Sequence, residues 1–151
     1  QHFAQAALVD LTDLPGAADD SATGADDGDL PAMKEHFLAS EWAGRTPLAV
    51  EIAVETVLDG IALRGRIDAV FARPDGGVTV VDWKTGEPPL GATARQRAIQ
   101  LGAYALAYAR LTGLPPEQVD AAFFYARTGE TVRPPLPTER ELLDVLALVT
   151  D

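Results

Sequence analysis

The sequence has 151 residues, a formal net charge of −11, 47% hydrophobic residues and no cysteine. A chain of this length suits one domain with a core of ordinary size, and it holds no apolar run of 18 residues that would suggest a membrane span. Without cysteine it can form no disulfide, thiolate zinc site or cysteine-held iron–sulfur cluster. It shows no signal-peptide pattern, and because it begins without Met we expect an excised domain or a processed fragment.

The acidity is concentrated near the N-terminus. Residues 10–40 hold eight acidic residues and one basic residue, whereas residues 41–151 hold fifteen acidic and eleven basic residues, which leaves −4 there. Residues 10–31 are poor in apolar side chains and predict a flexible acidic loop, whose simplest interpretation is a solvated insertion. We therefore expect one domain with an N-terminal helical region, truncated, over 1–46 and a core over 47–151. The mildly acidic core does not exclude nucleic acid, but it argues against capture by charge alone.

The hydrophobic periodicity alternates between helical and strand patterns along the chain. Helices are predicted at 1–9, 32–42, 93–111 and 139–149, and strands at 50–55, 61–73, 78–84, 119–126 and 130–133. Asp59-Gly60 predicts a hairpin between the first two strands, and Thr138 with Glu141 predicts a capping box at the last helix. The strand at 78–84 is almost continuously apolar, as expected for a central strand covered on both faces. The sequence thus predicts an α/β domain with a mixed sheet flanked by helices.

Two acidic residues are predicted to meet on a hairpin. The turn signal 74–77 separates two apolar runs, and Asp68 lies as far before Asp75 as Asp82 lies after it. Opposed residues of an antiparallel pair have Cβ atoms about 4.5–5.5 Å apart, and two carboxylates at that distance among apolar neighbours need a cation. Lys84 falls on the same face as Asp82 because strand side chains alternate. The pattern predicts a metal site, with a surface Asp–Lys pair at a strand end as the alternative.

The helix that follows carries Gln100 and Tyr104 on one face, since they are four residues apart. The segments GRIDAV, VVDWKTG and QLGAYALAY together resemble the nuclease domain of the RecB-like family. This family belongs to the PD-(D/E)xK nucleases and lies at the C-termini of bacterial helicase–nucleases. The resemblance covers about residues 48–126, and the Q-x3-Y pattern is its most specific part. Taken without the resemblance, Gln100 and Tyr104 would be ordinary helix–sheet packing residues.

The resemblance implies a restriction-endonuclease-like fold and a role for each matching residue. Asp68 and Asp82 would bind Mg²⁺ or Mn²⁺ with the Trp83 carbonyl as a third ligand, and Lys84 would be the catalytic lysine. Gln100 and Tyr104 would position the active site and the DNA backbone. A hard divalent cation held by carboxylates lowers the pKa of bound water and stabilises charge on a phosphoryl group.

The resemblance also implies a biological context. We expect a metal-dependent (exo)deoxyribonuclease domain of a protein that is also an ATP-dependent DNA helicase, active in DNA end processing, recombination and repair. Its partners would be single-stranded DNA, the motor domains of the same polypeptide and a second helicase–nuclease subunit, without a membrane, in the nucleoid-associated cytoplasm. A non-catalytic nuclease-fold module for DNA handling or subunit contact is the alternative, and a small-molecule phosphohydrolase ranks last.

Several polar residues have two open interpretations. The family usually has a metal-binding histidine on an N-terminal helix; we expect it upstream of this sequence rather than at His2, and we expect His36 on a helix surface. Glu51 and Glu55 would either add a carboxylate to the site or form a solvated strand face. Four arginines would contact phosphates or serve solubility and ion pairing: Arg95 and Arg97 on the long helix, and Arg64 and Arg66, which are expected to share the face of Asp68.

Overall fold

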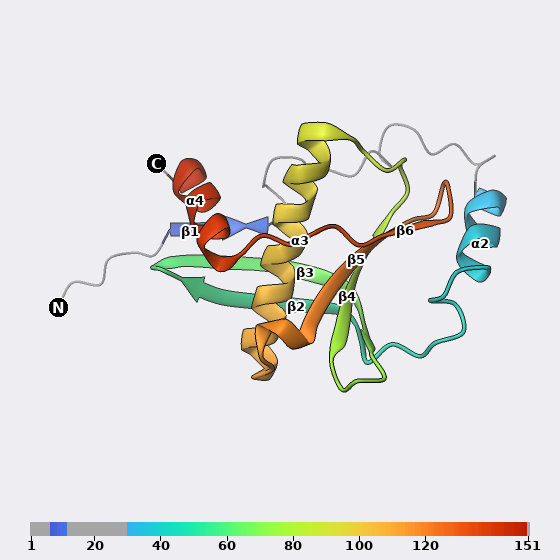
Figure 1. The fold of residues 1–151 in the computed structure, drawn as a ribbon, viewed down its shortest axis with the longest axis horizontal. Helices are drawn as coiled ribbons and strands as arrows, with labels where there is room; N and C mark the ends of the chain where they lie inside the picture. The colour runs from blue at the N-terminus through green and yellow to red at the C-terminus, as the bar shows by residue number, and fades with distance from the viewer. Residues whose placement is uncertain (1–6, 12–29, 151) are drawn as a thin grey trace.

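The computed structural model describes residues 7–11 and 30–150 and shows an α/β domain, which confirms the predicted fold class (Figure 1). The strands are β1 Ala7–Asp10, β2 Ala49–Leu58, β3 Ile61–Ala72, β4 Val78–Lys84, β5 Val119–Tyr125 and β6 Glu130–Val132. The helices are α2 Leu30–Leu38, α3 Gly91–Thr112 and α4 Glu139–Thr150, with a 3₁₀ turn η3 at Pro116–Gln118. Within these ranges, no helix is both long and apolar enough to cross a membrane.

The strands form one mixed sheet in the order β1-β3-β4-β5-β6, with β2 paired to β3. Strand β2 runs antiparallel along one edge of β3. The other edge is shared, because β1 pairs in parallel with Ile61–Arg64 and β4 pairs antiparallel with Ala69–Ala72. Between these two partners, residues 65–68 of β3 face no strand of the described chain on that edge. The sheet therefore splits there, and Asp68 lies at the end of the split.

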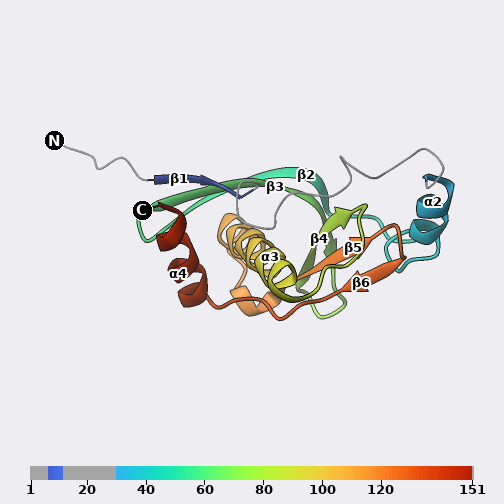
Figure 2. The ribbon, with the colours of Figure 1, turned by 90° about the horizontal axis from the view of Figure 1, so that it is seen from above.

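The two faces of the sheet bury separate cores. Helix α3 packs on one face, where Ile67, Val80 and Leu101 belong to the larger core, and Figure 2 shows α3 and α4 on the same side of β2 and β3. The opposite face buries Trp42 and Phe71 in a smaller core that Phe37 of α2 partly covers. Strand β4 lies between β3 and β5 and is buried along nearly all its length, as its apolar sequence predicted.

The local turn and capping signals are confirmed. Asp59 and Gly60 both have positive φ values, 50° and 77°, which match the two-residue turn between β2 and β3. Gly113 ends α3 in the left-handed region with φ 76°. The Thr138 backbone N–H donates to Glu141 Oε1 at 2.8 Å, and the Glu141 N–H donates to Thr138 Oγ1 at 3.1 Å. These elements form where local chemistry alone specifies them.

Two predictions about the N-terminal region are wrong where the structure describes it. Residues 7–9 form strand β1 rather than a helix, because their backbone pairs with β3, a distant partner that overrides local composition. Helix α2 ends at Leu38, so Trp42 lies beyond it, yet Trp42 is 1% exposed and packs on Phe71. The rest of the predicted acidic loop, residues 12–29, lies outside the described residues.

A kink shared by β2 and β3 changes which side chains face α3. Glu51 has a φ of 49°, and the pairing passes from Val50–Ala69 to Ile52–Ile67 without a Glu51–Asp68 pair. Ile67 and Val70 therefore both face the larger core although they are three residues apart. The alternation of side chains between the two faces of β3 shifts by one residue at Asp68. The predicted regular alternation of 50–55 is accordingly wrong at its start, where Val50 is 57% exposed.

The same shift corrects the expectation for two arginines. Arg64 and Arg66 precede the kink and lie on the solvent face, with side chains 55% and 63% exposed. Arg64 pairs with Asp10 at 3.8 Å and Arg66 with Glu51 at 3.6 Å. They do not share the face of Asp68, because a regular period of two does not hold across a kink.

Candidate active site

The hairpin brings the two predicted carboxylates together. Ala69 pairs with Val81 and Val70 with Val80, so the next position along the ladder sets Asp68 opposite Asp82. The Asp68 carboxyl is close enough to raise the pKa of Asp82, both as a hydrogen-bonding partner and through its charge. Asp68 Oδ2 also accepts a hydrogen bond from the Trp83 backbone N–H at 2.8 Å. This contact holds the Asp68 carboxylate against the end of β4, at the split of the sheet.

Lys84 completes the cluster on the same face. Its Nζ lies 3.1 Å from Asp82 Oδ2 and 5.9 Å from the ring centroid of Phe123 on β5. Asp82 is 8% exposed and Lys84 is 4% exposed. A lysine ammonium and a carboxylate in so little water interact more strongly than a surface pair does. The alternative of a surface Asp–Lys pair is thus wrong.

The Asp82 carboxyl is costly to ionise in this environment. The pKa of Asp82 is raised to about 7, chiefly by burial and also by the hydrogen bond and charge of Asp68, against the lowering effect of Lys84. One lysine therefore does not neutralise two adjoining carboxylates in a buried place. When both acids are ionised, the two carboxylates and the one ammonium leave a net negative charge, which a bound cation would neutralise.

Helix α3 forms the opposite wall. Gln100 and Tyr104 are 3% and 4% exposed. Gln100 Nε2 donates to the Leu11 carbonyl at 3.0 Å and to Tyr104 Oη at 3.4 Å. Burial raises the pKa of the Tyr104 phenol, and the negative charges of Asp82, Asp68 and Asp10 raise it further. Tyr104 is therefore a neutral hydrogen-bonding group within electrostatic reach of the acids.

The available donors suit a hard divalent cation. Asp68 and Asp82 provide carboxylate oxygens, and Gln100 Oε1 is a buried oxygen with no hydrogen-bond partner in the described chain. Mg²⁺ and Mn²⁺ prefer oxygen ligands and usually retain water. The described residues contain no group of three His, Cys, Asp or Glu side chains that could hold a metal. The two acids would therefore need backbone, amide or water oxygens to complete the coordination of a metal.

The other candidate residues make separate contacts, although Arg97 contacts Tyr125, the β5 residue paired with Lys84. His2 is outside the described residues, and His36 Nδ1 is hydrogen-bonded to the Ala126 carbonyl at 2.7 Å. Glu51 and Glu55 are exposed, as expected for a solvated strand face. Arg95 is exposed, whereas Arg97 is 2% exposed and donates to Tyr125 Oη at 3.4 Å.

Sequence reasoning missed the contribution of β1. The Leu11 carbonyl binds Gln100, and Asp10 is near enough to Tyr104 to affect its pKa. Both residues are far from the hairpin in sequence and fall at the start of the segment 10–31, which the sequence predicts to be an acidic loop. Three apolar residues followed by the charged Asp10 were the available signal for a short strand. Nothing in the local sequence, however, indicates its parallel partner β3.

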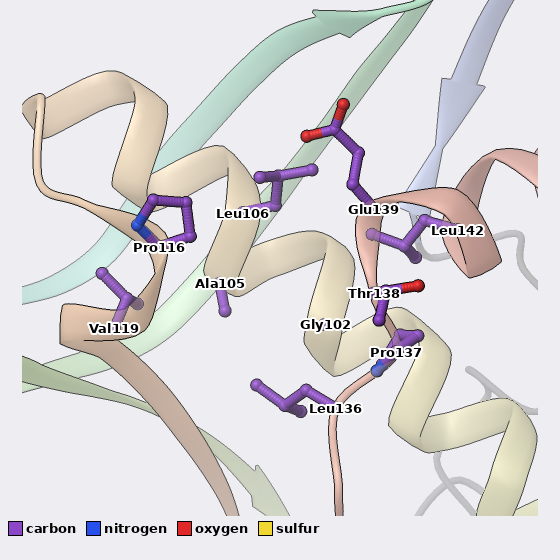
Figure 3. A pocket seen from close by; sticks show the side chains of 10 residues that line it. All are labelled: Gly102, Ala105, Leu106, Pro116, Val119, Leu136, Pro137, Thr138, Glu139 and Leu142. Atoms are coloured by element: carbon purple, nitrogen blue, oxygen red, sulfur yellow. The ribbon is translucent and has the colours of Figure 1, made fainter.

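A separate cavity has a different character. It has a volume of about 220 Å³ and lies between α3, η3 and the start of α4 (Figure 3). Its lining is mainly apolar and includes Ala105, Leu136 and Leu142, with Glu139 as its acidic member. It contains none of the predicted site residues. We interpret it as a gap in the packing between helices rather than an active site.

The fold and the paired acids indicate the class of the protein. It is an α/β domain with an Asp–Asp–Lys cluster at a split in its sheet, as in the restriction-endonuclease-like enzymes. The chain matches the PD-(D/E)XK nuclease superfamily over residues 4–150 and belongs to that superfamily. Members of this superfamily are generally nucleases and typically use Mg²⁺ or a similar divalent metal.

Two further similarities agree with this assignment. The chain is 38% identical over 89 residues to the gene 69 protein of Mycobacterium phage D29. This match covers 59% of this chain and 30% of that protein. The match thus spans less than a third of that relative. The crystal structure of SSO0001 superposes with a TM-score of 0.50 at 16% identity, over 97% of this chain and 79% of that chain. This second similarity concerns the fold alone.

Proposed function

We propose that this chain is the nuclease domain of a helicase–nuclease and hydrolyses phosphodiester bonds of DNA with Mg²⁺ or Mn²⁺. The observation that carries the proposal is the half-buried Asp68 opposite the buried Asp82, with the buried Lys84 Nζ 3.1 Å from Asp82 Oδ2. Gln100 contacts Tyr104 on α3, and Tyr104 lies within electrostatic reach of the acids, which supports the role that the Q-x3-Y pattern of RecB-like nucleases implies. Residues 47–151 would form the nuclease core.

Each residue has a role that follows from its contacts. Asp68 and Asp82 would hold the metal with the Trp83 carbonyl, and the Trp83 N–H bond to Asp68 fixes one of these carboxylates. A bound Mg²⁺ or Mn²⁺ would acidify water and offset charge on the phosphate. Lys84 would orient the attacking water and stabilise the developing negative charge, because its ammonium is held in a buried place. Tyr104, neutral at physiological pH, would donate a hydrogen bond to a phosphate oxygen.

The wider context rests on the resemblance and on charge. A core with a net charge of −4 over residues 41–151 is poorly suited to capturing DNA unaided. Delivery of a single strand by motor domains of the same polypeptide would remove that need. A role in DNA end processing and recombinational repair in the cytoplasm, with a second helicase–nuclease subunit as partner, follows from this proposal.

The test compares two variants with the wild type on end-labelled oligonucleotides with Mn²⁺. Asp82→Asn keeps the shape of the side chain but removes its charge, and Glu55→Gln makes the same change at an exposed strand position. We expect cleavage of single strands by the wild type and Glu55→Gln, and none by Asp82→Asn. Equal cleavage by Asp82→Asn, or binding of DNA without cleavage by the wild type, would reject the nuclease assignment.

A further inference from the structure

Gly65 lies in β3 where the sheet splits, three residues before Asp68. A Cβ atom added at Gly65 would lie 2.5 Å from Tyr104 Cε1 and 3.2 Å from Leu11 Cβ. The first distance is much shorter than a carbon–carbon contact of about 3.5–4.0 Å. The Tyr104 ring therefore lies directly against the backbone of β3, in the space that any other residue at position 65 would fill.

The backbone conformation does not explain this glycine. Gly65 is not among the glycines with positive φ, and its neighbours on β2 and β3 pair in an ordinary antiparallel register, with Val54 opposite Gly65. A glycine inside a strand weakens the strand by loss of packing and by backbone entropy. Close approach of another group is the remaining physical reason for it, and the nearest group is Tyr104.

The close approach matters because it holds a tyrosine that lies within electrostatic reach of the acids. Tyr104 Oη receives a hydrogen bond from Gln100 at 3.4 Å, and the phenol senses the charges of Asp82 and Asp68. The ring is thus held between the backbone of β3 and the Gln100 amide, which is itself bound to the Leu11 carbonyl. A displaced ring would carry its hydroxyl away from the carboxylates.

We propose that Gly65 is a positioning residue of the active site: its missing side chain seats the Tyr104 ring on β3 and thereby sets the Tyr104 hydroxyl beside Asp68 and Asp82. This inference rests on the proposed function for its catalytic consequence. We call the surface that Gly65 and Leu11 form under the Tyr104 ring the seat. The seat is a packing contact and does not depend on the proposed function.

A double-mutant cycle tests whether Gly65 acts through Tyr104. Gly65→Ala is expected to lower kcat for single-stranded DNA at least tenfold while KM changes less than twofold. In a Tyr104→Ala background the ring is absent, so adding Gly65→Ala is expected to change kcat less than twofold. An equal loss in both backgrounds would overturn the proposal, because Gly65 would then act through Asp68 or through the fold.

Two other glycines provide matched controls. A Cβ at Gly102 would lie 2.6 Å from Pro137 Cδ, outside the candidate site, and a Cβ at Gly44 would meet nothing within 4 Å. Gly102→Ala is expected to lower the melting temperature while kcat stays within twofold, and Gly44→Ala to change neither. If Gly65→Ala does not fold, recovery of folding in Gly65→Ala/Tyr104→Ala supports the steric seat, and failure of the double variant to fold rejects it.

A spectroscopic measurement separates the seat from the nuclease activity. The chain has three tyrosines, so 3-fluorotyrosine labelling gives three ¹⁹F signals that single Tyr→Phe variants assign. Gly65→Ala is expected to shift the Tyr104 signal more than those of Tyr108 and Tyr125. An unmoved Tyr104 signal rejects the proposal whether or not DNA is cleaved. A shifted signal in a protein whose wild type cleaves no DNA rejects the proposed function and leaves the seat in place.

Discussion

Asp68 and Asp82 lie opposite each other across the β3–β4 hairpin, and the neighbouring Asp68 carboxyl raises the pKa of Asp82. Such a pair stabilises the fold only while it shares a proton, because two adjoining carboxylates in a buried place repel each other. Lys84 reduces this repulsion but does not bring the pKa of Asp82 back to its ordinary value. The arrangement is suited to holding a cation, and its cost to the metal-free fold can be measured.

The first prediction concerns the pH dependence of stability without metal. The pKa of Asp82 is about 7 in the folded chain against 3.8 in its ordinary state. Between these values the folded state binds more protons than the unfolded state, so stability falls as pH rises through this window. One such proton corresponds to a slope of at most about 1.4 kcal/mol per pH unit. Urea unfolding with EDTA between pH 5 and pH 7 measures it.

Asp82→Asn provides the control for this slope, because asparagine does not titrate. We expect the variant to lose the decline between pH 5 and pH 7 and to be more stable than the wild type at pH 7. Two parallel curves of stability against pH would show that another group is responsible.

The second prediction concerns the metal. Mn²⁺ is expected to raise the melting temperature of the wild type with the logarithm of its concentration above Kd, and to have little effect on Asp68→Asn or Asp82→Asn. Because a ligand carboxylate must lose its proton, Mn²⁺ affinity is expected to fall about tenfold per pH unit below pH 7. Isothermal titration calorimetry in buffers with different ionisation enthalpies measures both the affinity for Mn²⁺ and the number of protons released on binding.

Glu55→Gln is the matched control for metal binding, since Glu55 is an exposed carboxylate on the neighbouring strand. We expect it to bind Mn²⁺ as the wild type does. Weakened binding in this variant would mean that Glu55 contributes a ligand, as the sequence alone left open.

The third prediction concerns the cap of α4. Thr138 is exposed and exchanges two hydrogen bonds with Glu141. Thr138→Ala is expected to lower the free energy of unfolding by about 1 kcal/mol, and Thr138→Ser to lower it by much less because serine retains the hydroxyl. Urea denaturation at pH 7 with saturating Mn²⁺ measures both. Equal losses in the two variants would show that the threonine methyl, rather than the cap, is important.

The capping box shows which features the sequence could predict. The box, the Asp59-Gly60 turn and the opposition of Asp68 and Asp82 each depend on residues close in the chain. A hairpin centred on its turn fixes the partner of every strand residue, so a count from Asp75 was enough.

The remaining features depend on partners distant in the chain. Strand β1 exists because it pairs with β3 more than fifty residues later, and no local pattern indicates a parallel partner. The kink at Glu51 and Asp68 reverses the alternation that assigned Arg66 to the site face. The reason for Gly65 is a ring on α3. Each requires the packed sheet and helix together, which a single sequence does not provide.

The last prediction concerns Lys84, whose Nζ lies 3.1 Å from Asp82 and is nearly excluded from water. Lys84→Met keeps the aliphatic stem and removes the charge, so cleavage in single-turnover assays is expected to fall by about 10²–10³. Mn²⁺ binding should survive, but its dependence on pH should move upward, because Lys84 lowers the pKa of Asp82. Lys34→Met is the control, since Lys34 is the other lysine of the sequence and is exposed. Undiminished cleavage by Lys84→Met would remove Lys84 from the mechanism, whereas loss of Mn²⁺ binding would assign it to the metal site instead.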